Sequence, residues 1–282
     1  MEKLMLFDTH LHLIYPDRLT YPWLDNAPLL NKPSLYPNYE KLAGRLGITG
    51  CFHMEVDVTE QQIKEETNLI NELMRQPNTL LAGMISSCRP ENEKFPNFLD
   101  WVLETPTIKG LRRVLHVVPD DVSKTEIFKD NVKRLSGTGI TFDLCASAKQ
   151  LSLLNGLVDH CPDVTFILDH CGVPDINSGE YSSWSSNVLE LSKRPNVFCK
   201  ISGIIAYGNP ETWTLSELRR YFEHIVSAFG PKRLVWGSDS PVCNLGANLE
   251  TWVAVTRALC NDWTSDDKDA LFYKNAQKIW NI

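Results

Sequence analysis

The sequence predicts an α/β protein in which residues 1–282 form one domain, a (β/α)8 TIM barrel. Three observations predict this fold class. Eight short apolar segments alternate with amphipathic segments of helical length, which is the order of elements in such a barrel. Several apolar segments, such as 164–168, are nearly continuous, as is usual for parallel strands buried on both faces. The chain also has about the length that this fold needs, and no linker divides it.

The expected strands follow from these apolar segments and are, in chain order, 4–10, 48–56, 79–86, 108–116, 139–145, 164–170, 197–203 and 233–239. The expected helices lie between them, at 59–75, 95–104, 124–136, 148–160, 182–193, 214–228 and 247–260, and a further helix at 265–280 packs on the barrel wall. Thr59 is the expected N-cap of the first of these helices. The structural alternative is an open doubly wound sheet. No Gly-x-Gly-x-x-Gly motif follows an early strand, so a dinucleotide-binding sheet has no support.

Two long connections, 13–38 and 171–184, follow the first and sixth strands. Loops of this length are usually functional or disordered, and their aromatic content argues against disorder. The aromatic residues are Tyr15, Tyr21, Trp23 and Tyr36 in the first loop and Tyr181 and Trp184 in the second. Both loops would lie on the C-terminal face, where barrel enzymes have their active sites.

Composition excludes several classes of function. A net charge of −7 disfavours a broad surface for nucleic acid or an anionic membrane, and no apolar run is long enough to cross a bilayer. The apolar run before Asp8 has four residues, too few for a signal peptide, so we expect a cytoplasmic protein. The eight cysteines form no Cys-x-x-Cys motif, and we expect reduced, buried thiols rather than a nucleophile. The sequence leaves open whether the chain is a monomer or a homo-oligomer.

The first strand ends in Asp8-Thr9-His10-Leu11-His12. Because side chains on a strand alternate between its faces, His10 and His12 should emerge on the same side. Two imidazoles aimed at one point suit a metal ion or a polarised carbonyl. Taken alone, such a pair is more often two ordinary polar residues in a turn. A second polar element, Trp236-Gly237-Ser238-Asp239-Ser240-Pro241, ends the last apolar strand and favours a functional site.

Ionisable side chains stand at several other strand ends, in segments that are otherwise apolar. Such groups are costly to bury unless they are paired or functional. They are Glu55 after strand 2, Arg112, Arg113 and His116 on strand 4, Asp169 and His170 after strand 6, Lys200 on strand 7 and Asp239 after strand 8. In a parallel barrel all of these ends share the C-terminal face, so the side chains should converge. Since Arg112 and Arg113 are adjacent, one of them should face the barrel interior and the other the surrounding helices.

Five segments resemble the amidohydrolase superfamily, and within it the amidohydrolase-2 branch of predicted metal-dependent TIM-barrel hydrolases. They are the two elements at 8–12 and 236–241, together with Tyr21-Pro22-Trp23-Leu24, Leu168-Asp169-His170-Cys171-Gly172 and Lys200-Ile201-Ser202-Gly203. The resemblance extends from residue 6 to about residue 280. The His-x-His and Gly-Ser-Asp motifs mark the superfamily, whereas the Tyr-Pro-Trp-Leu element is similar to the sugar lactonases of the fuconolactonase type.

This resemblance implies a distorted barrel of the amidohydrolase type and hydrolysis of a small lactone, derived from a sugar acid or a dicarboxylate. In that interpretation Asp239 is the general base that takes a proton from water. His10 and His12 hold either one divalent ion or the substrate carbonyl, and His170 orients the water or stabilises the oxyanion. The implied substrate contacts are Glu55, Arg112 or Arg113, His116 and Trp23. Lys200 is a weaker candidate, because the alternative for a lysine in a barrel strand is a pair with Asp239 purely for electrostatic balance.

The chain departs from part of the superfamily at a metal-binding position. Binuclear members use a bridging lysine at the end of strand 4, where this chain has arginines and His116. We therefore expect at most one divalent metal ion, with zinc as the first choice. The expected ligands are His10, His12 and Asp239, completed by Glu55 or His170. The alternative is catalysis without a metal, because a lactone is an activated acyl group that hydrogen bonds can polarise.

The aromatic loops favour a sugar ring as substrate, since its C–H faces pack well against aromatic side chains. The alternative is that these aromatics only seal the mouth of the barrel. Two other functions remain open. One is a metal-dependent, non-oxidative decarboxylase of an aromatic or unsaturated acid, which shares the barrel, the His-x-His motif and the last-strand aspartate. The other is an inactive barrel that binds sugar acids, which the intact set of candidate catalytic residues disfavours.

Overall fold

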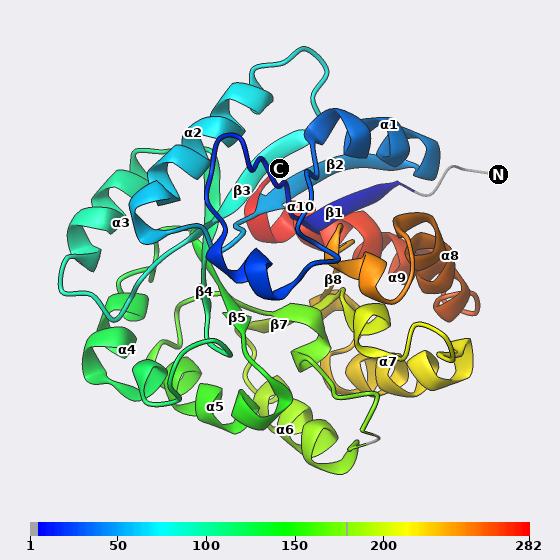
Figure 1. Ribbon diagram of the computed structural model, residues 1–282. Helices are drawn as coiled ribbons and strands as arrows, with labels where there is room; N and C mark the ends of the chain where they lie inside the picture. The colour runs from blue at the N-terminus through cyan, green and yellow to red at the C-terminus, as the bar shows by residue number, and fades with distance from the viewer. Residues whose placement is uncertain (1–4, 179) are drawn as a thin grey trace.

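The computed structural model describes residues 5–178 and 180–282. Parallel strands form a central barrel that helices surround (Figure 1). The strands are β1 (Leu6–Leu11), β2 (Ile48–Met54), β3 (Leu81–Ser87), β4 (Ile108–Val114), β5 (Thr141–Cys145), β6 (Phe166–Leu168), β7 (Val197–Ile201) and β8 (Leu234–Trp236). Each strand pairs with the next in sequence, and a parallel bridge between Leu11 and Ser240 closes the ring. The predicted (β/α)8 barrel is confirmed.

Every helix expected between the strands is present, with ends that shift by a few residues. These helices are α2 (Ile63–Met74), α3 (Phe95–Leu103), α4 (Glu126–Lys133), α5 (Leu151–His160), α6 (Ser182–Ser192), α7 (Leu215–Phe229) and α8 (Leu249–Leu259). The helix expected at 265–280 is divided into α9 (Ser265–Asp269), a π-helical turn (Ala270–Lys274) and α10 (Asn275–Trp280). All eight cysteines are free and buried, as expected of reduced thiols.

One helix was not expected from the sequence. The segment α1 (Tyr36–Leu46) forms where the first long loop was expected to continue to residue 38. Tyr36, Tyr39 and Ala43 recur at helical spacing and are buried, which gives α1 a face to pack on the barrel. Gly47 ends the helix in the left-handed conformation, with φ of 84°. The proline-rich segment before it concealed this pattern.

The predicted N-cap of α2 is also wrong. A 3₁₀ turn, Glu60–Gln62, separates Thr59 from the helix, and the side chain of Thr59 caps neither element. Its hydroxyl instead donates to the side-chain oxygen of Gln62. The cap was assigned from residue type alone, which does not show whether a 3₁₀ turn comes before the helix.

The barrel interior is apolar towards the N-terminal end of the barrel. Side chains from several strands, together with α10, form this cluster: Phe7, Phe52, Met54, Ile85, Ile167, Val235, Ala276 and Trp280. The ring of Trp280 packs edge-on against Phe52 at 5.1 Å between centroids, and its indole N–H donates to the hydroxyl of Thr141 at the start of β5. Helix α10 therefore closes the N-terminal opening of the barrel, rather than packing on its wall as expected (Figure 1). Within the described residues, the helices are all too short or too polar to span a membrane.

Candidate active site

A pocket of about 350 Å³ opens among the C-terminal ends of the strands. This is the face on which the polar strand ends were expected to converge. Six residues predicted from the sequence line it: His12, Trp23, Arg112, His116, His170 and Asp239. His10 is fully buried beside them, with its Nε2 atom 3.1 Å from Nε2 of His12. The structure therefore brings the four side chains expected to be catalytic to one point.

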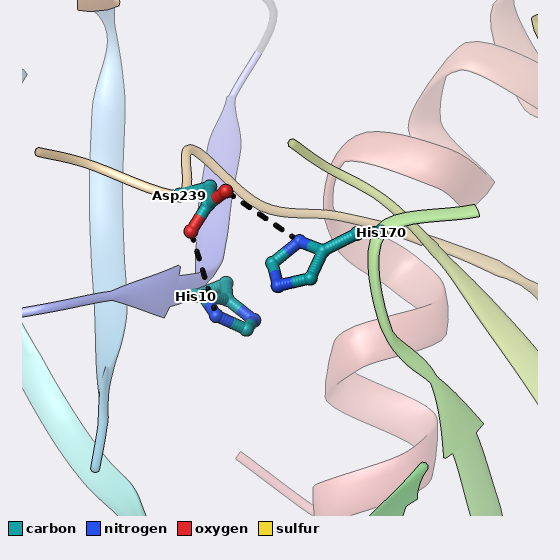
Figure 2. Close-up of side chains that lie close together, drawn as sticks. All are labelled: His10, His170 and Asp239. Carbon is teal, nitrogen blue, oxygen red and sulfur yellow. Dashed lines mark ion pairs between the residues drawn. The ribbon is translucent and has the colours of Figure 1, made fainter. Parts of the chain in front are cut away.

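Asp239 occupies the centre of this arrangement, and Figure 2 shows its carboxylate between the rings of His10 and His170. Its Oδ1 lies 3.7 Å from Nε2 of His10 and 3.5 Å from Nε2 of His12, and its Oδ2 lies 3.6 Å from Nδ1 of His170. These separations exceed hydrogen-bond length, and both oxygens are buried without a hydrogen-bond partner. Buried carboxylate oxygens normally have partners, so this pair is suited to a water molecule, a cation or a substrate.

The backbone explains how two of these side chains reach the centre. His170 and Asp239 both follow short strands, and both have left-handed backbone angles, with φ of 51° and 55°. Residues other than glycine rarely adopt this conformation, and they do so mostly at functional sites. Gly203 lies against both side chains, since a β-carbon there would stand 2.7 Å from Nδ1 of His170 and 2.9 Å from Oδ2 of Asp239. The glycine of the Lys-Ile-Ser-Gly motif is thus required by this close approach.

Asp8 positions the site without lining the pocket. Its Oδ1 accepts the backbone N–H groups of His10 at 3.1 Å and of Ser238 at 2.7 Å. Its Oδ2 accepts the hydroxyl of Tyr39 at 2.6 Å. The backbone N–H of Asp239 donates to the carbonyl of His10 at 2.8 Å. These bonds join the end of β1 to the segment after β8, so they hold the strand ends that carry His10 and Asp239 in register.

Burial determines the charge of the central groups. It raises the pKa of Asp239 to about 6, which makes this carboxylate a stronger base than an exposed aspartate. Burial also lowers the pKa of His170, and it lowers that of His12 to about 3, so both rings are neutral at pH 7. Nδ1 of His12 lies 3.1 Å from the backbone carbonyl oxygens of Met54 and Glu55 and must donate to them. The lone pair on Nε2 of His12 therefore faces the other imidazoles.

Arg112 is the inward member of the adjacent arginine pair. Its Nε donates to Oε1 of Glu55 at 2.6 Å, and its Nη1 lies 3.5 Å from Oδ2 of Asp169. Burial opposes the charge on Glu55, but Arg112 outweighs it and holds the pKa of that carboxyl below its usual value. Glu55 does not line the pocket and contacts Arg112, which does. The guanidinium charge is therefore already balanced by buried carboxylates.

Arg113 points to the opposite side of β4, where its guanidinium binds Oε1 of Glu91 at 2.7 and 2.9 Å. It does not line the pocket, so the geometry does not support it as a substrate contact. His116 does line the pocket, with its Nδ1 3.7 Å from Sγ of Cys145. Burial raises the pKa of the Cys145 thiol, which keeps it protonated and unsuited to nucleophilic attack.

Lys200 does not pair with Asp239, the partner that the sequence offered as an alternative for it. Its Nζ lies 2.6 Å from Oδ2 of Asp143 and 2.9 Å from Oδ1 of Asp169. Asp143, on β5, was missed by the sequence analysis. The same criterion that identified the other strand ends, an ionisable residue in an otherwise apolar strand, would have found it.

Most aromatic residues of the long loops do not reach the pocket, which corrects the expectation that both loops offer rings to a substrate. Trp23 and Tyr207 are the aromatic residues in the pocket wall. Tyr21 instead accepts the backbone N–H of Tyr15, and Trp184 donates to the backbone carbonyl of Cys171. Tyr207 was not predicted, because it lies in a 3₁₀ turn after β7 that carries no motif.

The donor set fits one divalent cation. One ligand atom each from His10, His170 and Asp239 lies within 4.8 Å of the others, and Nε2 of His12 is beside them. The unpartnered oxygens of Asp239 and the lone pair of His12 are ligands of the kind that zinc prefers. Nη1 of Arg112 lies 3.4 Å from Nε2 of His10, and this neighbouring positive charge disfavours a second ion.

Comparison with known proteins gives the following matches. A family model described as "Amidohydrolase" matches residues 7–282. The chain is similar to the L-fucono-1,5-lactonase of Burkholderia ambifaria, with 28% identity over 248 residues that cover 86% of this chain and 83% of that protein. It is also similar to the 4-sulfomuconolactone hydrolase of Rhizobium radiobacter, with 27% identity over 246 residues that cover 83% and 75%. A solved amidohydrolase structure from Burkholderia multivorans with bound zinc has a TM-score of 0.88 at 19% identity, covering 99% of both chains.

Proposed function

Because this chain belongs to the amidohydrolase family, we propose that it hydrolyses a small, uncharged lactone of a sugar acid. The observation that carries this proposal is Asp239, a buried carboxylate without a hydrogen-bond donor that stands beside neutral imidazoles. A carboxylate in such surroundings is suited to accept a proton near neutral pH. The two relatives named as lactone-hydrolysing enzymes support this class of reaction.

The arrangement of side chains supports attack by water. A water molecule beside Asp239 transfers a proton to the carboxylate as its oxygen bonds to the lactone carbonyl carbon. His170, held by the hydroxyl of Ser202 at 3.0 Å, orients this water. The carbonyl oxygen of the lactone becomes an oxyanion, which hydrogen-bond donors in the pocket stabilise. Collapse of the intermediate breaks the bond to the ring oxygen, which takes the proton from Asp239, and the product is an open hydroxy acid.

The charges of the pocket favour an uncharged substrate. Arg112 is the one lysine or arginine in the described pocket wall, and Glu55 and Asp169 already balance it. Asp57, also in the wall, pairs with Arg89 at 3.3 Å. In the metal-free site, Asp239 carries a negative charge whose nearest ionisable neighbours are neutral imidazoles rather than a cation. A lactone that carries a carboxylate or sulfonate would be repelled, whereas the hydroxyl groups of a sugar lactone can bond to the paired side chains.

We expect the purified protein to release one proton for each neutral sugar lactone opened, and no carbon dioxide. The measurement is a pH-stat assay with three groups of compounds: neutral sugar lactones, lactones that bear an acidic group, and unsaturated or aromatic acids. Neutral lactones should be turned over and the acidic lactones far more slowly, because of the unpaired negative charge. Asp239→Asn protein prepared in parallel controls for contaminating esterases.

The other outcomes of this assay identify the alternative functions. Carbon dioxide from the acids, with every lactone left intact, would replace the lactonase by the decarboxylase. If no compound is converted but sugar acids bind in a calorimeter, the chain is an inactive binding barrel. Faster hydrolysis of the acidic lactones than of the neutral ones would overturn the charge argument while leaving lactone hydrolysis in place.

A second expectation concerns metal content. A divalent ion held by Asp239 and the neighbouring imidazoles would polarise the lactone carbonyl or the attacking water. We expect at most one equivalent of zinc or another divalent metal per chain, because strand 4 carries arginines in place of a bridging lysine. Elemental analysis of the purified protein, before and after treatment with a chelator, measures this. Two equivalents that resist dialysis would contradict it.

A further inference from the structure

Asp57 follows β2 and lines the pocket, but it takes no part in the proposed attack by water. Nη2 of Arg89 donates to its Oδ1 at 3.3 Å. Arg89 itself lies outside the pocket wall, where its Nη1 donates to the hydroxyl of Ser87 at 2.7 Å. Among residues 5–178 and 180–282, no group donates a hydrogen bond to Oδ2 of Asp57. Oδ2 is therefore the acceptor that Asp57 offers to the pocket.

Two buried carboxylates fix the backbone around Asp57. The N–H of Val56 donates to Oε1 of Glu66 at 3.0 Å, and the N–H of Asp57 donates to Oε2 of Glu55 at 2.7 Å. Asp57 has a left-handed backbone, with φ of 44°. Residues other than glycine adopt this conformation infrequently, and where the surrounding structure fixes them in it they cluster at active sites and ligand clamps. The carboxylate of Asp57 is thus held ready before any ligand binds.

A tryptophan side chain is attached to the same segment. The indole N–H of Trp23 donates to the backbone carbonyl of Val56, the residue before Asp57, at 2.9 Å. Trp23 is partly exposed and lines the pocket together with Asp57. A sugar ring has C–H faces that pack on an aromatic ring, and hydroxyl groups at its edge that donate to acceptors. This wall of the pocket offers both kinds of contact.

We propose that Asp57 is a specificity-determining residue that binds hydroxyl groups of the substrate while the ring packs on Trp23. The inference rests on the function proposed above and deepens it, because it requires a lactone with two neighbouring hydroxyls that both donate to Oδ2. One carboxylate oxygen can accept two such bonds, and bonds to a charged acceptor are stronger than those between neutral groups. Arg89 is a positioning residue, since it holds Oδ1 and so orients Oδ2. A lactone without hydroxyls would cover this carboxylate without giving it a donor.

Asp57→Asn is expected to weaken the binding of hydroxylated lactones. The amide oxygen keeps the bond to Arg89, so the amide nitrogen takes the place of Oδ2 and presents donors where the hydroxyls need an acceptor. We expect KM for the best neutral six-membered lactone of an aldonic acid to rise by about tenfold or more. The value of kcat should stay nearly unchanged, because these bonds form in the ground state and in the transition state alike.

δ-Valerolactone, the same ring without hydroxyls, serves as the reference substrate. The ratio of kcat/KM for the hydroxylated lactone to kcat/KM for δ-valerolactone should fall by about tenfold or more in Asp57→Asn. A residue that only supports the fold would lower both values together and leave the ratio unchanged. If Asp57→Asn does not fold, Asp57→Gly takes its place, since glycine also tolerates the left-handed backbone and removes both oxygens.

Glu91→Gln is the matched control. The side chain of Glu91 is 27% exposed, against 26% for Asp57, and it also pairs with an arginine, at 2.7 Å from Arg113. Glu91 lies outside the pocket wall, so its variant should keep the wild-type ratio. An unchanged ratio in a folded Asp57 variant, or an equal fall in Glu91→Gln, would overturn the proposal.

A binding experiment separates this inference from the lactonase assignment. Calorimetry compares glucono- and galactono-lactam, six-membered lactams with hydroxyls, with δ-valerolactam, which has none. We expect the wild-type protein to bind one of the hydroxylated lactams at least about tenfold more tightly than δ-valerolactam, and Asp57→Asn to lose this preference. Binding without preference, or no binding of any lactam, would overturn the proposal. Because the lactams need not be opened, a preference that depends on Asp57 in a protein that hydrolyses no lactone would reject the lactonase alone.

Discussion

Asp239→Asn is expected to lower kcat for lactone hydrolysis by about 10²–10⁴-fold, the usual contribution of a general base. The amide has nearly the shape of the carboxylate, but it cannot accept a proton from water. Both oxygens of Asp239 are without hydrogen-bond partners, so the substitution breaks no side-chain hydrogen bond. Asparagine also tolerates the left-handed backbone at this position, with φ of 55°. We therefore expect the variant to fold normally.

The assay for this variant is steady-state kinetics on the best neutral lactone, with circular dichroism to verify the fold. Asp17→Asn, the same substitution on an exposed residue of the loop after β1, is the matched control and should keep full activity. Near-normal kcat in a folded Asp239→Asn protein would remove this residue from the proposed mechanism.

Arg112→Met is expected to have the largest effect on stability. It removes the cation that binds Glu55 at 2.6 Å and approaches Asp169 at 3.5 Å, and both carboxylates are fully buried. Loss of one partner of a buried ion pair leaves an uncompensated charge and lowers the free energy of unfolding by about 3–5 kcal/mol. Urea denaturation measures this difference.

The double variant Arg112→Met with Glu55→Gln tests the cause of that loss. Since it removes the charge of both partners, it should recover part of the stability lost in the single variant. If the double variant is no more stable than Arg112→Met alone, the loss comes from packing rather than from the stranded carboxylate. Arg18→Met, which breaks an exposed pair with Glu72, should change the stability far less.

The strand ends were predictable because their geometry follows from the fold. In a parallel barrel, the carboxyl ends of all strands meet on one face, so His10, His170 and Asp239 had to approach one another once the strands were located. The same alternation rule showed that one of Arg112 and Arg113 faces inward, but not which one. That choice depends on the register of β4 relative to β3, where an irregularity occurs between Met84 and Ile85.

Local sequence patterns could not predict other features of the site. The partners of Lys200 lie 57 and 31 positions away in sequence, and no spacing rule states which carboxylates a buried lysine meets across a barrel. The orientation of the aromatic residues in the loops was predicted wrongly for a related reason. A high number of aromatic side chains indicates that a loop is packed, but it does not show whether these side chains face the pocket. Trp23 lines the pocket, whereas Trp184 lies at the start of α6 and is fully buried outside the pocket wall.

The closure of the N-terminal end of the barrel by α10 determines the route by which substrate and product reach and leave the pocket. Because Trp280 and its apolar neighbours fill the N-terminal opening, the pocket opens on the C-terminal face, so in the proposed reaction the lactone would enter and the acid would leave by that mouth. In the proposed reaction, hydrolysis converts an uncharged lactone into an anion beside Asp239, whose charge is also negative in the metal-free site. Repulsion between these charges would favour release of the product by the route through which the substrate enters. We therefore expect accumulated acid to compete only weakly with fresh lactone.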